Sequence, residues 1–186
     1  MFDRKEFKRL VEKELKTDFF TPGHINRCFE NLEKIKDSFF DEELVFAGIF
    51  LHSAGFPMSL KFNQDLVSTS MNLAKKILNE SNFPKEKTEA VFHCIQEAGL
   101  KGQPKTIEAI LVRDVNLLDE ISAVGLIKEI SVFSSRKISL RKFLEEQKSN
   151  SFLLKEAFLT DKAKTLSEEK ISLFNSFIES LEKDLK

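Results

Sequence analysis

The sequence has no tryptophan and no tyrosine, and only two cysteines, six glycines and four prolines among its 186 residues. So few glycines and prolines exclude collagen-like and low-complexity chains. Cys28 and Cys94 lie singly in apolar stretches, which excludes a disulfide framework and a cysteine-rich zinc site and fits a reducing compartment. All 19 aromatic residues are phenylalanines, so none carries a hydrogen-bonding group.

Neither sign of charge is in surplus, because 29 Lys and Arg face 30 Asp and Glu. This balance argues against a dedicated nucleic-acid-binding protein, whose phosphate contacts need surplus cations. The charged N-terminal segment has no signal-peptide core, and the most apolar run, Leu44 to Leu51, is too short to cross a bilayer. We therefore expect a soluble, cytoplasmic protein with neither nucleic acid nor a membrane as partner.

Helical periodicity dominates what is present, and no run alternates with period two. We predict an all-α protein with one domain over residues 1–186, a core over about 20–125 and C-terminal helices over 126–186 packed on it. The expected helices run from Phe2 to about Lys16, from Thr21 past Ile35, from Asp41 to near Gly55 and Pro57, from Asn63 to Asn79, from Pro84 to Gly99, from Pro104 to Ile121, from Val124 to Phe133, and once or twice between Phe152 and Leu185.

The details of these helices are also predicted. Thr21 is expected to cap the second helix, with Pro22 at its first position. The third helix, apolar nearly all round, is expected to be central and buried. The inward faces of two others follow from their spacing. The fourth helix should bury Val67, Met71, Ala74 and Leu78, and the last should bury Leu166, Ile171, Phe174, Phe177, Ile178 and Leu181.

The three histidines, His24, His52 and His93, lie on three different predicted helices. Each could simply be a histidine at the edge of the core with its hydrogen bonds satisfied. Because helical bundles build metal sites from side chains on facing helices, the histidines could instead converge on a metal ion. The residues alone leave both interpretations open.

Several segments resemble the HD superfamily of metal-dependent phosphohydrolases, and most closely a bacterial branch that includes nucleotide pyrophosphohydrolases. GHINRCFENLEKI is similar to the branch's H-I-x-R-V helix, and LVFAGIFLHSAG to its apolar helix that ends in His-Asp. VFHCIQEAGLKG and TIEAILVRDVNLLDEISAVG resemble two later motifs, so the likeness runs from about residue 20 onward. It implies an all-α fold with His24 and His52 as metal ligands, and Arg27, His93 and Lys101 in substrate binding.

The departures from the branch pattern fall on its acidic metal ligands. The Asp of the His-Asp pair is Ser53, and the distal ligand Asp is Asn116, while Asp114 and Asp119 match flanking acids. Asp114 cannot simply replace the ligand, because two residues turn a helix by about 200°. The expected site is thus His24, His52 and Asn116, with Ser53 at the Asp position; no catalytic residue is assigned.

Two functional hypotheses follow from this degenerate site. In one, the metal site has decayed, and the protein binds a ligand or partner with little or no hydrolysis. In the other, it hydrolyses a nucleotide or related phosphate ester with an altered ligand set, for which Asp41, Glu42, Glu43 and Glu97 are the nearest candidates. In the first, a divalent metal (Mn, Mg, Fe, Co, Ni or Zn) would be held weakly, if at all. In both, a nucleotide or other phosphate-containing small molecule is the expected partner.

Overall fold

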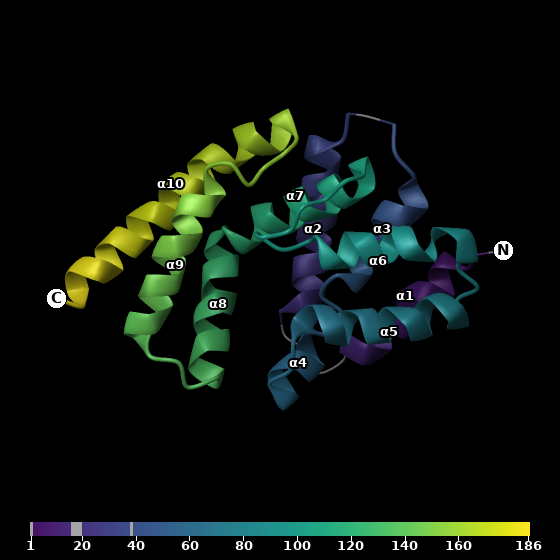
Figure 1. The fold of residues 1–186 in the computed structure, drawn as a ribbon, viewed down its shortest axis with the longest axis horizontal. Helices are drawn as coiled ribbons and strands as arrows, with labels where there is room; N and C mark the ends of the chain where they lie inside the picture. Colours follow the sequence, from purple (N-terminus) through teal and green to yellow (C-terminus); the bar gives the residue numbers. More distant parts are fainter. Residues whose placement is uncertain (1, 16–19, 38) are drawn as a thin grey trace.

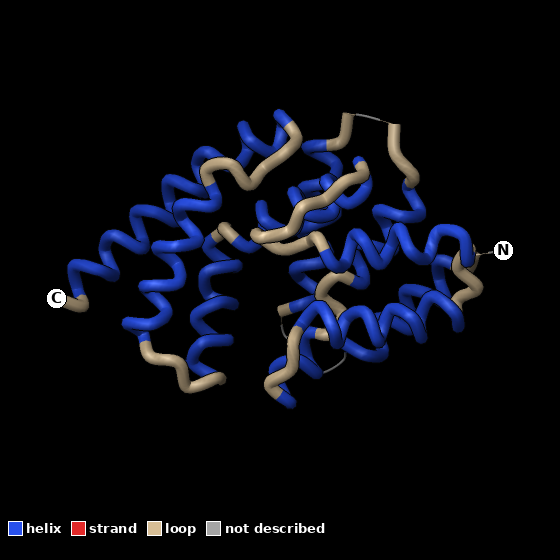
Figure 2. The backbone as a smooth tube through the Cα atoms, in the orientation of Figure 1, coloured by secondary structure: helices blue, strands red, loops and turns tan. Residues whose placement is uncertain are grey.

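The computed structural model describes residues 2–15, 20–37 and 39–186, and this part of the chain is all-α, with no strand (Figures 1 and 2). The prediction of the fold class is therefore confirmed. The elements are α1 (Arg4–Leu15), α2 (Thr21–Ile35), α3 (Glu42–Leu51), α4 (Phe56–Phe62), α5 (Leu66–Glu80), the 3₁₀ turn η1 (Lys85–Lys87), α6 (Thr88–Gln96), α7 (Ile107–Glu120), α8 (Ala123–Ser135), α9 (Leu140–Leu154) and α10 (Asp161–Asp184).

Helix α7 is the centre of the fold, and α2, α3, α6, α8 and α10 all pack against it (Figure 1). Most of its residues are buried, including the polar side chains Arg113, Asp114, Asn116 and Asp119. Burial of so many polar groups requires partners for each of them. Helix α7 therefore joins the N-terminal helices, on one side, to the C-terminal helices, on the other.

The third helix is buried as its composition predicts, and phenylalanines fill the space between it and α1. Phe7 packs edge-on against Phe2 and Phe50, and Phe46 packs against Phe50 and Phe29. Such edge-to-face pairs add to the stabilisation that burial gives. Phe7 and Val11 of α1 belong to the same core as α2 and α7, so the predicted core limits of 20–125 omit a helix that contributes to it.

Two predicted helix starts differ from the structure. Helix α2 has Phe20 rather than Thr21 at its N-cap, because the Phe20 carbonyl already accepts the His24 N–H. The sixth predicted helix begins at Ile107 and not at Pro104, because the Thr106 side chain accepts from the Ala109 N–H and caps it. The predicted end of the first helix at Lys16 lies outside the described residues.

The segment after α3 contains a helix that the sequence analysis missed. Helix α3 ends at Leu51, and Pro57 lies in the first turn of a new helix, α4, rather than marking the end of the third. Asp65 caps the following helix, which begins at Leu66 and not at Asn63. Half of its predicted inner face is observed, since Ala74 and Leu78 are buried, while Val67 and Met71 are not.

Ser70 is fully buried on α5, where its hydroxyl accepts the Gly55 N–H, while Val67 is 36% exposed. A polar side chain with a backbone partner can thus lie on the inner face of a helix, which a hydrophobic pattern does not reveal.

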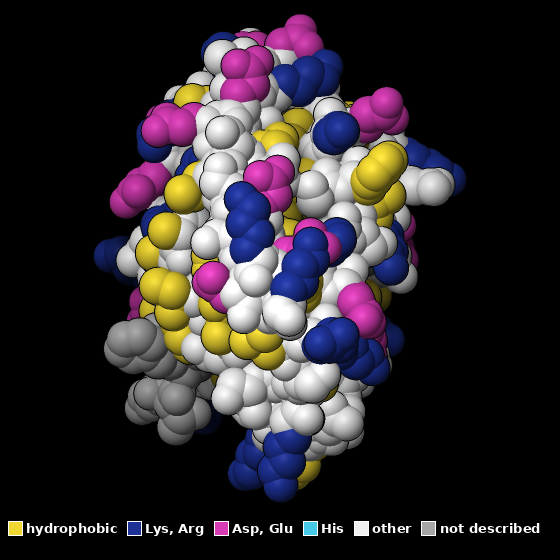
Figure 3. All heavy atoms as spheres, turned by 90° about the vertical axis from the view of Figure 1, so that its left-hand side faces the viewer, with side chains coloured by type: hydrophobic (Ala, Val, Ile, Leu, Met, Phe, Trp, Pro, Cys, Tyr) yellow, Lys and Arg dark blue, Asp and Glu magenta, His cyan; other side chains and the backbone are white. Residues whose placement is uncertain are grey.

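Helix α9 was not predicted either. It begins within the basic run SSRKISLRK, and the charges of this run obscured the helical spacing of the apolar residues that follow. Ser139 caps α9, which buries Phe143 and Leu144. Helix α10 buries Phe174 and Ile178 as predicted, but Leu166 is 37% exposed. At this end of the molecule, apolar and charged side chains share the surface (Figure 3).

One stretch of the described residues, Glu42–Phe62, is long and apolar enough by composition to cross a bilayer. In the fold it forms α3 and α4 with a turn between them, and 67% of its most apolar window is buried inside the protein. The central helix of a folded core passes the same test of length and composition. The cytoplasmic location stays a prediction.

Candidate metal centre

Three segments that are distant in sequence bring polar side chains together in the core. Helix α2 provides His24 and Cys28, the end of α3 provides His52, and α7 provides Asn116 and Asp119. All five are buried. We call these five residues the histidine cluster; its geometry can be built one hydrogen bond at a time.

Asp119 holds the ring of His24 in one orientation. His24 Nδ1 lies 2.6 Å from Asp119 Oδ2, and Arg27 donates to both oxygens of the same carboxylate, with 2.5 Å between Nε and Oδ1. Burial alone would raise the pKa of Asp119, but hydrogen bonds from His24 and Arg27 outweigh it and lower the pKa to about 2. The carboxylate is therefore ionised, so His24 Nδ1 carries the proton and His24 Nε2 has a free lone pair.

His52 is oriented by the backbone of its own helix. Its Nδ1 lies 2.9 Å from the Ile49 carbonyl oxygen, which can only accept, so Nδ1 carries the proton. Burial, followed by the nearby charges of His24 and Lys128, lowers the pKa of His52 to about 3. Neutral His52 thus presents the lone pair of Nε2.

Hydrogen bonds to Ala98 and Glu120 orient the side-chain amide of Asn116. Its Nδ2 donates to the Ala98 carbonyl oxygen at 2.9 Å, and the same amide is a hydrogen-bond partner of Glu120. The amide oxygen Oδ1 is left facing His52 Nε2, at 3.2 Å. The side chain therefore points an acceptor, and not a donor, at the histidines.

The lone pairs of His24 Nε2, His52 Nε2 and Asn116 Oδ1 converge, with 2.8 Å between the two nitrogens. With the protons fixed elsewhere, no hydrogen lies between these atoms. Burial also lowers the pKa of His24, so protonation of the pair is disfavoured. A metal ion binds where several lone pairs point to one place and no hydrogen lies between them. The two imidazole nitrogens and the amide oxygen meet this requirement.

Two further buried residues, Ser53 and Cys28, belong to the same region of the core. The Ser53 hydroxyl, next to His52 in the chain, is buried without a hydrogen-bond partner among the described residues. The ligand atoms of His24, Cys28 and His52 lie within 4.8 Å of one another. Burial raises the pKa of the Cys28 thiol well above its ordinary value, so without a metal the thiol is protonated.

The charged groups nearest the cluster are Lys128 and Glu120. Lys128 is 9% exposed, its ammonium lies 4.9 Å above the ring of Phe56, and its charge lowers the pKa of both His24 and His52. Burial raises the pKa of Glu120 to about 7. The sequence analysis singled out neither residue. Glu120 follows Asn116 by one turn of α7, whereas Lys128 comes near only when α8 packs beside α7.

The structure thus brings His24, His52 and Asn116 together, while the place of Ser53 beside them and their role as metal ligands stay predictions. Asp119 was expected only as a flanking acid, and the structure shows it as the carboxylate that orients His24. Its spacing to Asn116, three residues on one helix, was the available signal.

The residues expected in substrate binding are held by separate partners. Arg27 pairs with Asp119. His93 accepts the Lys105 N–H through Nε2 at 3.0 Å, and Lys101 is exposed. Their binding of substrate stays a prediction.

The four acids considered as replacement ligands are remote from the cluster or engaged elsewhere. Asp41 caps α3 and pairs with Lys87, which also binds Glu43. Glu97 accepts the Gln103 N–H. Glu42 lies in the first turn of α3, at the opposite end of that helix from His52. None of them faces His24 or His52 through a contact that the structure records.

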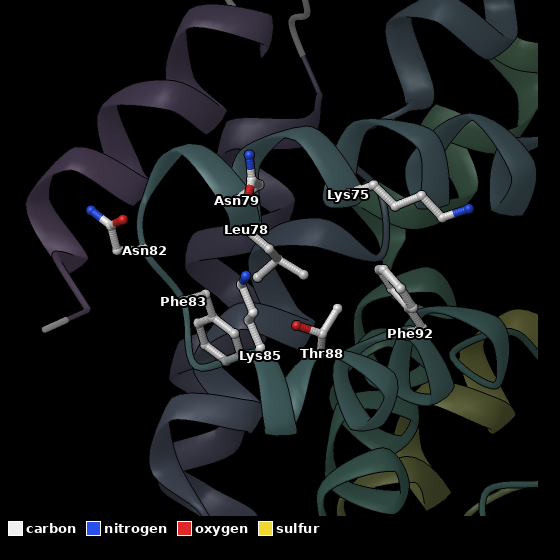
Figure 4. A pocket seen from close by; sticks show the side chains of 8 residues that line it. All are labelled: Lys75, Leu78, Asn79, Asn82, Phe83, Lys85, Thr88 and Phe92. Atoms are coloured by element: carbon white, nitrogen blue, oxygen red, sulfur yellow. The ribbon is translucent and has the colours of Figure 1, made fainter.

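A surface pocket of about 400 Å³ between α5, η1 and α6 is a separate feature (Figure 4). Lys75 and Lys85 extend at its rim, and Phe83 and Phe92 form apolar walls. No residue of the histidine cluster lines it. The pocket therefore gives no access to the cluster.

Solved structures share this arrangement of helices. A protein from an uncultured Thermotogales bacterium, described as a predicted HD superfamily hydrolase, superposes with a TM-score of 0.64 at 18% identity, covering 98% of this chain and 93% of that one. The present chain has the HD-domain fold.

Two further solved structures share the HD-domain fold. A Lactobacillus plantarum protein superposes with a TM-score of 0.77 at 16% identity, over 100% of this chain and 99% of that one. A Listeria innocua protein, Lin1889, gives 0.65 at 19% identity, over 96% and 97% of the two chains. No family model and no curated protein matches the sequence. The closer likeness to nucleotide pyrophosphohydrolases stays a prediction.

Proposed function

We propose that this protein is an HD-type phosphohydrolase relative whose metal centre has decayed, and that it acts by binding a phosphate-containing ligand or a partner. The observation that carries the proposal is the convergence of His24 Nε2, His52 Nε2 and Asn116 Oδ1 without any carboxylate among them. These three ligand atoms keep the arrangement of a metal site, but none of them carries a negative charge.

Charge decides which cations such a site can hold. Mg²⁺ and Mn²⁺ prefer anionic oxygen ligands, whereas Ser53 and Asn116 are neutral. At about 4 Å and an effective dielectric constant of about 20, each missing carboxylate removes roughly 4 kcal/mol of gross attraction. The buried ammonium of Lys128 opposes a cation further.

A bound metal would supply an activated water and polarise a phosphoryl oxygen. The residues of this chain would contribute orientation: Asp119 fixes the proton on His24 Nδ1, Ile49 fixes it on His52 Nδ1, and Ala98 fixes the amide of Asn116. This support keeps the lone pairs aimed at one point.

A phosphate group needs cations, and Lys128 is the one best placed for it. Arg27 is already neutralised by Asp119, and the expected residues His93 and Lys101 have no recorded contact with the cluster. Lys128 forms no hydrogen bond and no ion pair within 4.0 Å with the described residues, and it lies over Phe56, whose N–H bonds the Ser53 carbonyl. A phosphate group beside Ser53 would give its ammonium an anionic partner.

Calorimetric titration with Mn²⁺ tests the proposal. The natural protein should bind Mn²⁺ weakly, and the double variant Ser53→Asp with Asn116→Asp should bind it at least 100-fold more tightly, because two carboxylates return to the cluster. The matched control, Ser131→Asp with Asn72→Asp, adds the same charge at exposed positions and should leave binding unchanged. Ser53→Asp enlarges a buried side chain, so circular dichroism should accompany each titration.

The second hypothesis, an active phosphohydrolase, is favoured by one observation. Glu120 lies beside Asn116, and its carboxyl group could complete an altered ligand set. Tight binding of Mn²⁺ by the natural protein, together with metal-dependent release of phosphate from nucleotides, would establish this hypothesis and overturn the decayed site.

A further inference from the structure

Cys28 is the only group of the histidine cluster that could give a metal a negative charge without displacing an existing bond of comparable strength. Asp119 is committed to His24 and Arg27, and Asn116 and Ser53 are neutral. The Cys28 sulfur has only weak contacts, with the Val115 carbonyl at 3.7 Å and with the ring of His24. The sulfur is thus close to the ligand atoms and weakly held.

The separations between ligand atoms suit a tetrahedral ion. Metal–sulfur and metal–nitrogen bonds of about 2.3 and 2.1 Å place sulfur and nitrogen about 3.6 Å apart and two nitrogens about 3.4 Å apart. Cys28 Sγ lies 3.7 Å from His24 Nε2, His52 Nε2 lies 3.2 Å from Asn116 Oδ1, and the two nitrogens, at 2.8 Å, need to separate slightly. Two of these three separations are thus close to those that a tetrahedral ion requires.

The sulfur must turn before it can bind. It lies 3.7 Å from His24 Nε2 and 3.9 Å from His24 Nδ1. Because these distances are nearly equal, the sulfur does not lie in the direction of the Nε2 lone pair. A turn of the Cys28 side chain toward the ion breaks only weak contacts of the sulfur, with the Val115 carbonyl and the ring of His24. Because His24 and Cys28 are four residues apart on α2, both side chains project from the same helix face.

We propose that Cys28 is a thiolate ligand in this cluster and that the site selects Zn²⁺ or Co²⁺ rather than Mg²⁺ or Mn²⁺. Binding forms one metal–sulfur bond and releases the thiol proton to water, so one proton leaves for each ion bound. Thiolate and imidazole are the ligands that favour borderline metals over hard ones. This inference rests on the proposed metal role of His24 and His52 and adds the sulfur to it.

Cobalt alone is the probe, because a cobalt–thiolate bond gives a near-ultraviolet charge-transfer band that imidazole and amide ligands do not give. The absence of tryptophan and tyrosine leaves that spectral region clear. The protein, kept reduced, should show this band on addition of Co²⁺, and Mg²⁺ in excess should not displace it. Cys28→Ser should abolish the band and weaken Zn²⁺ binding at least tenfold.

Cys94 provides the matched control, since it is the other buried cysteine and lies on α6. Cys94→Ser should keep the band at full intensity. A cobalt complex with visible bands and no charge-transfer band would overturn the thiolate ligand while leaving the histidine site intact. A band that survives Cys28→Ser would overturn it as well.

X-ray absorption at the zinc edge of the natural protein gives an answer even if Cys28→Ser fails to fold. One sulfur scatterer at about 2.3 Å supports the inference, and a shell of nitrogen and oxygen alone overturns it. Failure of the proposed function has a different signature, namely tight Mn²⁺ binding with hydrolysis. No binding of Co²⁺ or Zn²⁺ at all would overturn the thiolate inference and leave the decayed metal centre standing.

Discussion

Asp119 illustrates how a residue outside the ligand set can decide the chemistry of a site. It holds the proton of His24 on Nδ1 and leaves Nε2 free to bind. Groups of this kind orient metal-binding histidines in many proteins, and their loss typically weakens metal binding 10- to 100-fold. The same carboxylate also neutralises Arg27.

Asp119→Asn is therefore expected to lower Zn²⁺ or Co²⁺ affinity by about 10- to 100-fold, because an amide can donate to Nδ1 and move the ring proton to Nε2. Nitrogen-15 NMR of the histidine rings would report the change of tautomer directly. Asp161→Asn, at an exposed carboxylate on α10, is the matched control and should change neither quantity. An unchanged tautomer in Asp119→Asn would contradict the assignment of Asp119 as the orienting group.

At the scale of elements, the fit of α3 against α6 and α7 sets the position of His52. Gly48 lies one turn before His52, and a Cβ there would come within 2.8 Å of Val112 Cγ2 and 3.1 Å of Cys94 Cβ. The helices approach this closely because glycine has no side chain. The position of the second histidine thus depends on a residue without a side chain, whose carbonyl oxygen also accepts the His52 backbone N–H.

Gly48→Ala should destabilise the protein by about 1–3 kcal/mol, because the added methyl group overpacks the contact between helices. Urea unfolding followed by far-ultraviolet circular dichroism measures this change. Gly99→Ala is the matched control, since a Cβ there meets nothing within 4 Å, and it should change stability little. Equal stability of the two variants would show that α3 can shift to accommodate the methyl group.

Local signals in the sequence predicted most helices, whereas the meeting of His24, His52 and Asn116 was expected only from the resemblance to the HD superfamily. Helical spacing and caps such as Asp41 act within a few residues, so they can be recognised without a structure. The approach of Lys128 and the role of Asp119 depend on how α7 and α8 pack against α2 and α3, and no local pattern specifies that. Helix α4 and the buried Ser70 escaped prediction for the same reason.

At the scale of the whole molecule, buried titratable groups make the free energy of unfolding depend on pH. His52, with a pKa lowered to about 3, binds protons more readily when unfolded, so its contribution to stability is complete above about pH 6.5 and declines as the pH falls towards 3. The pKa of Asp119 is lowered to about 2, so this residue adds to the loss of stability below pH 3.8. The pKa of Glu120 is raised to about 7, so this residue has the opposite effect: its contribution to stability is complete below about pH 4.5 and is lost as the pH rises to 7.

We therefore expect a nearly constant free energy of unfolding between pH 7 and 4.5, where these effects oppose one another, and a steep fall below pH 4.5. Urea unfolding at a series of pH values measures it. Glu120→Gln removes the opposing group, so its stability relative to the natural protein should rise with pH from 4.5 to 7. A constant difference over that range would contradict the raised pKa of Glu120.

The carboxylate of Asp114 determines how late in synthesis the core of the protein can form. It is fully buried and accepts the Leu159 and Thr160 N–H groups and the Thr160 hydroxyl at the start of α10. A ribosome makes Asp114 about 45 residues before these partners. Until they leave the exit tunnel, the central helix carries a charge that it cannot bury, so the nascent chain completes its core only late in synthesis.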